Sequence, residues 1–453
     1  MDRSSRISRR QFVRVGSAAT LGALSLPYII PSSALGQGPG TGANQRITMG
    51  FIGAGGKGMH NLDQLMQFPE VQVVAVCDVD RRHLTPAQDH VHGYYTEKTG
   101  KEWRGCGAYV DYRDLVARDD IDAVCVSTPD HWHALTTVAA ADAGMHVYCE
   151  KPLANSVGEG RAMVEAVTRH KVVYQNGSHE RSTSSIRSAC ELVRNGYIGD
   201  LKSIRINLPC SDPHHLEAQA YKQIPPPEPV PPELDWNHWL GHTPEVPYAE
   251  RRCHFWWRFI LSYGGGEMTD RGAHVIDIGQ LGAGMDDTGP VEIEAKGEQT
   301  PGSLYNAWWN YSFTNTYANG LKLIGVCEDP RGLKFEGSEG SIFVHIHGGA
   351  LEAEPASLLD IKLPEEKMTL GRSPGHHRNF VEAILGQAQP MAPAEAGHRT
   401  ASICHLNNIA MKIGRPLKWD PVAERVTNVE EANDLLTPRM RMPWKLAWRG
   451  RRY

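Results

Sequence analysis

The chain has 453 residues and a nearly balanced charge, with 47 lysines and arginines against 52 aspartates and glutamates. This length suits two domains, and the balance excludes the basic surface with which proteins attach to nucleic acids or acidic membranes. The nine cysteines include no Cys-x-x-Cys pair, and several lie in apolar segments. We therefore expect buried thiols rather than a disulfide framework or a zinc knuckle.

The N-terminus predicts an export signal. Residues 8–13, Ser-Arg-Arg-Gln-Phe-Val, resemble the twin-arginine motif, and a mostly apolar stretch follows over residues 12–30. Residues 34–36, Ala-Leu-Gly, offer small residues at the spacing that signal cleavage requires. The stretch is too weakly hydrophobic for a stable membrane anchor. We expect a removable signal over residues 1–36, a linker over residues 37–45, and a periplasmic or otherwise extracytoplasmic protein.

The next segment reads as strand, glycine-rich turn, helix and strand. The turn is Gly53-Ala54-Gly55-Gly56-Lys57-Gly58, and the second apolar run ends at Asp78. Together they form the dinucleotide-binding fingerprint. Gly53 allows the tight turn, Gly55 lets backbone N–H groups approach a pyrophosphate, and Gly58 lets the helix pack closely. The carboxylate of Asp78 would accept hydrogen bonds from a ribose diol and repel a 2′-phosphate, so NAD is favoured over NADP.

The rest of the first domain alternates strands and helices. Residues 121–127 and 146–149 read as buried strands, and residues 134–143 read as a helix. This alternation predicts a doubly wound parallel Rossmann sheet over residues 46–170. Ligands of such sheets bind at the carboxyl ends of the strands. The candidate cofactor contacts at those ends, besides the glycines and Asp78, are Thr128, Pro129, His133, Glu150 and Lys151.

Three motifs resemble the glucose–fructose oxidoreductase and inositol dehydrogenase family, written Gfo/Idh/MocA. They are GFIGAGGKG at the turn, VSTPDHWH after the third long strand, and CEKPL over residues 149–153. The resemblance runs from about residue 46 to the C-terminus. It implies a nicotinamide cofactor, a Rossmann domain and a second α+β domain with an open, mainly antiparallel sheet. It also implies that Lys151 points at the reacting carbon and its hydroxyl, and that an unusual peptide bond precedes the motif proline.

A second candidate site lies in the second domain, residues 171–453. Residues 264–277, GGGEMTDRGAHVID, read as a glycine loop that leads into a helix. Asp270 and His274 are four residues apart, so they would share a helical face, where the carboxylate could orient the imidazole as a general base. From spacing alone, the alternative is a helix cap and a buried helix histidine. The family resemblance implies such a pair against the substrate hydroxyl, so we assign both residues, with Lys151, to catalysis.

Three other segments of the second domain have structural interpretations as well as functional ones. Residues 209–263 form a long proline-rich excursion whose four tryptophans either stack on sugar rings or latch the loop to the core. His345 and His347 could lie on one strand face, but no acidic or cysteine partners cluster nearby, so we expect no metal site. The basic tail, residues 439–452, is expected to pack against the domain or against a partner subunit rather than bind RNA.

These features predict an exported oxidoreductase that transfers hydride between a secondary hydroxyl of a sugar, polyol or glycoside and NAD. Free NAD is scarce outside the cytoplasm and the twin-arginine route carries folded proteins, so the cofactor would be loaded before export and turnover would be redox-neutral. One alternative is an NAD-dependent glycosidase or epimerase that oxidises its substrate transiently. The other is a non-catalytic carbohydrate-binding protein, which would tolerate the loss of Lys151 or His274. The open sheet favours a homo-oligomer, either a dimer or a tetramer.

Overall fold

The fold is described from a computed structural model, which covers residues 46–448 and 451–452. The predicted export signal and the linker lie outside these residues. None of the helices in the described part of the chain combines the length and the hydropathy that a membrane span needs.

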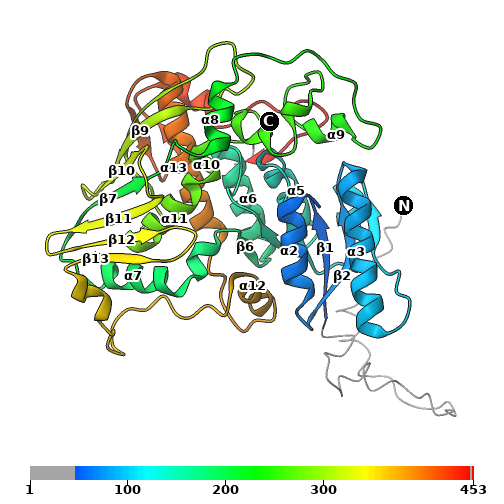
Figure 1. The fold of residues 1–453 in the computed structure, drawn as a ribbon, viewed down its shortest axis with the longest axis horizontal. Coiled ribbons are helices and arrows are strands. Elements are labelled where there is room, and N and C mark those ends of the chain that lie inside the picture. The colour runs from blue at the N-terminus through cyan, green and yellow to red at the C-terminus, as the bar shows by residue number, and fades with distance from the viewer. Residues whose placement is uncertain (1–45, 449–450, 453) are drawn as a thin grey trace. The chain divides into compact units, whose positions relative to one another are not determined.

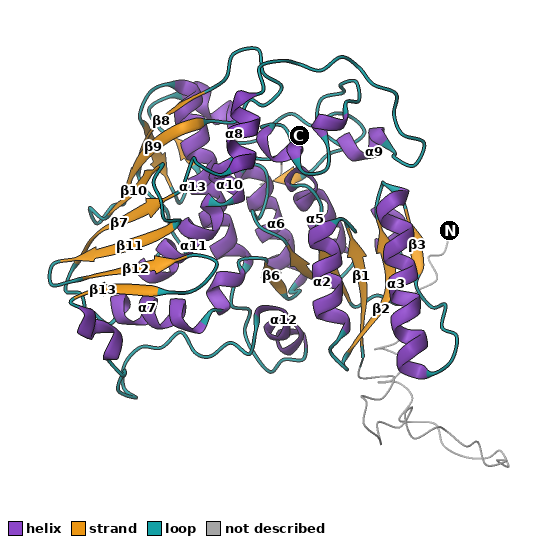
Figure 2. Cartoon of the chain, in the orientation of Figure 1, coloured by secondary structure: helices purple, strands orange, loops and turns teal. Residues whose placement is uncertain are grey.

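The first half is built on a six-stranded parallel sheet in the order β3-β2-β1-β4-β5-β6 (Figures 1 and 2). The strands are β1 Ile47–Ile52, β2 Val71–Cys77, β3 Gly107–Tyr109, β4 Ala123–Val126, β5 His146–Cys149 and β6 Tyr174–Asn176. The long strands are almost continuously apolar because helices cover both faces of the sheet. The predicted doubly wound sheet is confirmed. Strand β6 belongs to this sheet, which therefore continues past the domain boundary expected at residue 170.

Helices connect these strands, and their ends follow local sequence signals. They are α2 Gly56–Met66, α3 Arg81–Thr99, α4 Tyr112–Val116, α5 His133–Asp142 and α6 Val157–His170. Asp80 caps α3 by accepting from the Arg82 N–H, and Gly100 ends it with a φ of 65°. Ser156 caps α6 in the same way.

The second half is built on a nine-stranded sheet in the order β13-β12-β11-β7-β10-β9-β8-β14-β15. Its pairings are antiparallel except for the parallel pair β7–β10, so the predicted open, mainly antiparallel sheet is confirmed. Helices α7 Ser184–Arg194, α11 Gly272–Ala283 and α13 Ala394–Ile413 pack against it. The strands are β7 Leu201–Asn207, β8 Glu292–Glu298, β9 Trp309–Thr316, β10 Lys322–Val326, β11 Gly332–Gly337, β12 Ser341–His345, β13 Leu351–Glu354, β14 Leu417–Asp420 and β15 Arg425–Val426.

The excursion over residues 209–263 returns to the first domain. It carries the short helices α8 Pro213–Ala220 and α9 Trp236–Leu240, along the top of the view in Figure 1. The Arg81 N–H donates to the Glu233 carbonyl at 2.9 Å, so the excursion is tied to the segment after β2. Trp236 and Trp239 are buried and stacked, with ring centroids 4.9 Å apart. Trp239 also packs against His131 of the first domain, with ring centroids 5.3 Å apart, so this tryptophan helps to hold the excursion against that domain.

A disulfide joins Cys210 and Cys327, 117 residues apart in the sequence. No disulfide framework was expected from the sequence, and this pair was not predicted. The two cysteines follow β7 and β10, which run parallel and adjacent with Asn207 opposite Val326, so both strand ends come together. The other thiols, including those of Cys77, Cys125 and Cys149, are buried and free, as expected.

The C-terminal segments pack back on the first domain. Helix α12 His376–Ile384 contacts α2, and Phe380 is buried in a cluster with side chains of β1 and β2. In the tail, Trp444 is buried against Trp132, with ring centroids 5.0 Å apart. The basic tail thus packs against the protein, as predicted, and ends in the hairpin of β16 Ala447–Trp448 and β17 Arg451–Arg452.

Candidate active site

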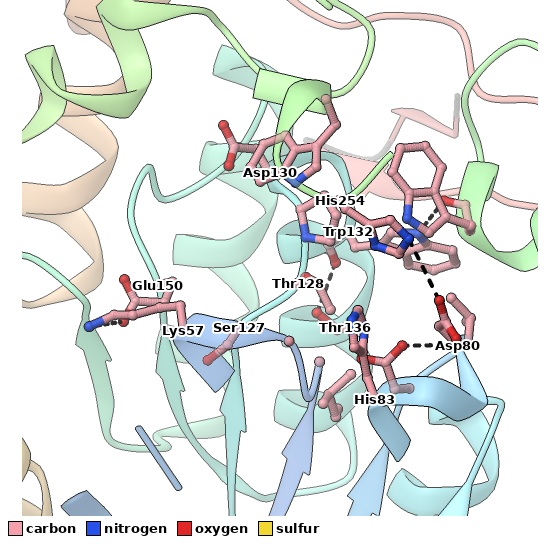
Figure 3. A pocket seen from close by; sticks show the side chains of 18 of the residues that line it. Lys57, Asp80, His83, Ser127, Thr128, Asp130, Trp132, Thr136, Glu150 and His254 are labelled. Atoms are coloured by element: carbon pink, nitrogen blue, oxygen red, sulfur yellow. Dashed lines mark hydrogen bonds and ion pairs between the residues drawn. The ribbon is translucent and has the colours of Figure 1, made fainter. Parts of the chain in front are cut away.

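A cavity of about 390 Å³ lies at the carboxyl ends of the strands of the first sheet (Figure 3). One wall consists of the glycine turn after β1, Asp78 after β2, and the loops that follow β4 and β5. The opposite wall comes from the excursion and from α10 Glu267–Asp270. Figure 3 shows the ion pair of Lys57 and Glu150 on one side of this cavity, where the two atoms are 3.5 Å apart.

The glycine turn has the geometry that a bound pyrophosphate needs. Gly53 has a φ of +90°, and a Cβ there would lie 2.7 Å from the Ser127 carbonyl oxygen. A Cβ on Gly58 would lie 2.0 Å from the Gly53 oxygen, so helix α2 packs directly on the turn. Gly55 and Gly56 instead face open space in the cavity, at the N-terminus of α2. The helix dipole and an open cradle of backbone N–H groups fit an anionic dinucleotide.

Asp78 is fixed beside this turn. Its Oδ2 accepts from the Ala54 N–H and its Oδ1 accepts from the Asp80 N–H, each at 2.8 Å. Burial raises the pKa of Asp78, while these two hydrogen bonds oppose that shift. A carboxylate oxygen has two lone pairs, so each oxygen keeps one for a ribose hydroxyl.

The residues predicted after β4 and β5 fall into two groups. Thr128, Pro129, Glu150 and Lys151 line the cavity. His133 does not, because its ring is fully buried between two loops: Nδ1 lies 2.7 Å from the Pro152 carbonyl and Nε2 lies 3.0 Å from the Thr128 carbonyl. The prediction of a cofactor contact at His133 is therefore wrong. The ring holds the two loops of the site together instead.

Lys151 and Asp270 meet in the cavity wall, although they are 119 residues apart in the sequence. The lysine Nζ donates to Asp270 Oδ1 at 2.7 Å and to the Asp270 carbonyl at 2.5 Å. The Arg258 Nε lies 3.7 Å from the same carboxylate. Burial alone would raise the pKa of Asp270, but Lys151 and Arg258 outweigh burial and hold it below its usual range. The Lys151–Pro152 peptide bond is cis, as the family resemblance implied.

His274 is not paired with Asp270. Helix α10 ends at Asp270 and α11 begins at Gly272, so the two residues do not lie on one continuous helix. The Asp270 carboxylate bonds to Lys151, and the His274 Nδ1 has no hydrogen-bond partner among the described residues. The predicted orienting role of Asp270 is therefore wrong. Burial and the nearby charge of Lys151 lower the pKa of His274 well below its usual value, so the ring is neutral at pH 7.

The cavity also contains residues that the sequence analysis did not select. Asp130 lines it and is 5% exposed, and burial raises its pKa well above the usual value. It lies within the VSTPDHWH motif, so its position after a strand was the signal that could have identified it. Arg258 reaches the cavity from the excursion, where no local motif marks it, and so does Trp257, one of the four tryptophans for which sugar stacking was one of two interpretations.

Two family models match the chain. The NAD-binding Rossmann fold of the Gfo/Idh/MocA oxidoreductases matches residues 47–178, and the C-terminal alpha/beta domain of the same family matches residues 184–446. The chain belongs to the Gfo/Idh/MocA oxidoreductase family. Both models describe an oxidoreductase family, and the first of them describes an NAD-binding Rossmann fold.

Individual relatives are more distant. A glycosyl hydrolase family 109 protein of Shewanella baltica is 29% identical over 209 residues, and an alpha-N-acetylgalactosaminidase of Shewanella oneidensis is 27% identical over 209 residues. Each match covers 43% of this chain and 44% of the relative, so the similarity spans less than half the length of these curated proteins.

Solved structures resemble the fold over a larger part of the chain. The aldose-aldose oxidoreductase from Caulobacter crescentus, complexed with glycerol, has a TM-score of 0.58 at 18% identity and covers 82% of this chain and 99% of its own. The WlbA dehydrogenase from Bordetella pertussis, in complex with NADH and UDP-GlcNAcA, has a TM-score of 0.58 at 16% identity and covers 83% and 99%. A levoglucosan dehydrogenase in complex with NADH and L-sorbose has a TM-score of 0.55 at 20% identity and covers 83% and 99%.

Proposed function

We propose that this oxidoreductase transfers hydride between NAD and a secondary hydroxyl of a sugar, polyol or glycoside. The observation that carries the proposal is the Lys151 ammonium group, which Asp270 fixes in the wall of the cavity that also contains the glycine turn. NAD, when bound, accepts or returns the hydride. The relatives and structural neighbours that act on or contain sugars support the substrate class.

The chain's own residues would polarise and deprotonate the hydroxyl. Lys151 uses two N–H groups on Asp270 and keeps a third, which can donate to the substrate oxygen and stabilise negative charge developing there. His274 remains our candidate for the base because its Nδ1 is free of hydrogen bonds within the described part of the chain, although its ring is not among the residues that line the cavity. Asp130 is the competing candidate, since it lines the cavity directly.

Absorbance at the NADH wavelength tests the activity. The enzyme is mixed with NAD and a panel of sugars, polyols and glycosides, and we expect NADH formation with at least one member. His274→Ala and Asp130→Asn then separate the two candidate bases. Loss of NADH formation in the first variant alone, with NAD binding unchanged, supports His274. Normal turnover in that variant would transfer the role to Asp130.

A second candidate function is glycoside cleavage or epimerisation through transient oxidation. The similarity to a glycosyl hydrolase family 109 protein, 29% identical over 209 residues, favours it. Such a reaction regenerates NAD within each turnover. Mass spectrometry of a glycoside panel incubated without added cofactor would show cleaved or epimerised products, whereas net oxidation would give a ketone and NADH.

We also propose that the protein is exported by the twin-arginine route with its cofactor already bound. The disulfide between Cys210 and Cys327 supports this compartment, because disulfides persist in oxidising surroundings. The arginine pair at residues 9 and 10 is the expected recognition signal. Fractionation of cells that express the wild type or an Arg9→Lys, Arg10→Lys variant tests export. Acid extraction of the mature protein, followed by nicotinamide quantification, tests retention of the cofactor.

A further inference from the structure

Two histidines and a glutamate from distant parts of the chain meet outside the cavity. His179 and Glu180 lie in the 3-10 turn His179–Ser182 after β6, and His347 lies in the turn after β12. Each offers one ligand atom, and these three atoms lie within 4.8 Å of one another. Glu180 and His347 are 167 residues apart in sequence, which is why the sequence analysis found no acidic partner near His347.

The two distances from Glu180 match those between neighbouring ligands of one ion. Glu180 Oε1 lies 3.0 Å from His347 Nδ1 and 3.4 Å from His179 Nε2. Two atoms that are each about 2.1 Å from an ion are about 3.4 Å apart at the tetrahedral angle and about 3.0 Å apart at a right angle. Imidazole nitrogen and carboxylate oxygen together suit a divalent transition metal such as zinc.

Neighbouring groups hold the donors in place. The Thr183 hydroxyl donates to Glu180 Oε2 at 3.3 Å, and the His347 backbone N–H donates to Glu180 Oε1 at 3.0 Å. His347 has a φ of 65°, a conformation that residues with side chains seldom adopt. The buried ring of His274 packs edge-on against both other imidazoles, with centroids 4.9 Å away in each case. Such supporting contacts fix the orientation of metal ligands.

The cluster is also open on one side. The Glu180 side chain is 4% exposed, whereas the side chains of His179 and His347 are 40% and 38% exposed. An ion could enter from solvent and would retain a position for water or a ligand oxygen, unlike the closed four-ligand sites that only stabilise folds. We propose that His179, Glu180 and His347 bind a divalent transition-metal ion with at least one open coordination position. This binding does not depend on the hydride transfer proposed above.

Cobalt titration of the untagged protein, stripped with a chelator, tests the proposal. We expect one equivalent of Co²⁺ to give a saturable visible absorption band that Zn²⁺ abolishes. His347→Gly removes one ligand while glycine readily adopts the positive φ, and Glu180→Gln removes the charge shared by both imidazoles. Each should weaken Co²⁺ binding at least about tenfold.

His345→Ala is the matched control. His345 lies two residues away and is bonded to Glu352 at 2.7 Å, so it is also a histidine paired with a carboxylate, although its side chain is only 27% exposed. Its removal should leave Co²⁺ affinity unchanged. The proposal is overturned if no saturable band appears, or if His345→Ala weakens binding as much as His347→Gly does. Far-UV circular dichroism of each variant confirms that it is folded.

Discussion

Lys151 is held in the site by Asp270, a residue 119 positions away in the sequence. Asp270 comes from the second domain and accepts the lysine ammonium through both its carboxylate and its backbone carbonyl. This double contact directs the remaining N–H away from Asp270. A lysine held by two hydrogen bonds is positioned to donate its third N–H to one oxygen position.

The first prediction concerns this lysine. Lys151→Met should lower kcat by about 10²–10⁴-fold, because polarisation of the reacting oxygen is lost, while NAD affinity changes little. Lys57→Met is the matched control, since Lys57 lines the cavity at the glycine turn and pairs with Glu150. That variant should weaken NAD binding and spare kcat at saturating NAD. Steady-state kinetics and NAD titration measure both. Equal kcat values for Lys151→Met and the wild type would contradict the role.

The sequence could predict the residues of the site that belong to local motifs. The glycines, Asp78 and Lys151 each follow a strand, so the topology of a parallel sheet places them at one edge. The partners that cross between domains could not be predicted in this way. Asp270 has the spacing of a helical partner of His274, but the helix is interrupted between them, and the carboxylate pairs with Lys151 instead. His133 has the right position in its motif, yet it faces away from the cavity.

At the scale of elements, the turn between β1 and α2 combines two requirements in a few residues. The missing side chain of Gly58 lets the helix pack against the turn, whereas the missing side chain of Gly56 leaves open the space that the cofactor needs. The strands around them were predictable because buried parallel strands form apolar runs. Strands β11 and β13 and the pair β14 and β15 were not predicted. These strands are short, so their alternation of buried and exposed residues gives only a weak signal. Their pairing also depends on partners far away in the sequence.

The second prediction separates these two requirements. Gly58→Ala should destabilise the fold by about 1–3 kcal/mol and abolish NAD binding, because its Cβ would meet the Gly53 oxygen. Gly56→Ala meets no atom within 4 Å, so it should leave the free energy of unfolding nearly unchanged and weaken NAD binding alone. Urea unfolding and NAD titration distinguish the two outcomes. Similar loss of stability in both variants would refute this division of roles.

At the scale of the whole molecule, a buried charge cluster joins the two domains. Arg161 of α6 bonds to Glu395 of α13 at 2.7 Å and to Glu424, before β15, at 2.6 Å. The ring of His398 also bonds to Glu424, at 2.7 Å. Glu424 is 3% exposed, so its charge depends on these partners. Burial alone would raise the pKa of Glu424, but His398 and Arg161 outweigh burial and lower it to about 2.

The third prediction follows from the direction of that shift. Because the pKa of Glu424 is lower in the folded protein than in the unfolded chain, its stabilisation is present at neutral pH and is lost as pH falls from about 4.5 towards 2. Glu424→Gln should therefore cost about 3–5 kcal/mol at pH 7, and the gap to the wild type should narrow in that acidic range. Glu430→Gln, in an exposed pair with Arg425, should change stability by less than about 0.5 kcal/mol. Urea unfolding at several pH values measures both. A pH-independent gap would contradict the assignment.

The last prediction connects stability with the compartment. The disulfide between Cys210 and Cys327 closes a loop of 117 residues across the parallel pair β7–β10, so it restricts the unfolded chain. The double variant Cys210→Ser, Cys327→Ser should lose about 2–4 kcal/mol of stability, and reductant should destabilise the wild type but not the variant. Peptide mapping without reduction should find the two cysteines linked in exported protein.

In the Arg9→Lys, Arg10→Lys variant, which we expect to remain in the cytoplasm, the same thiols should react with an alkylating agent. Reactive thiols in both preparations would mean that the bond does not form in the cell, and would remove the structural support for export.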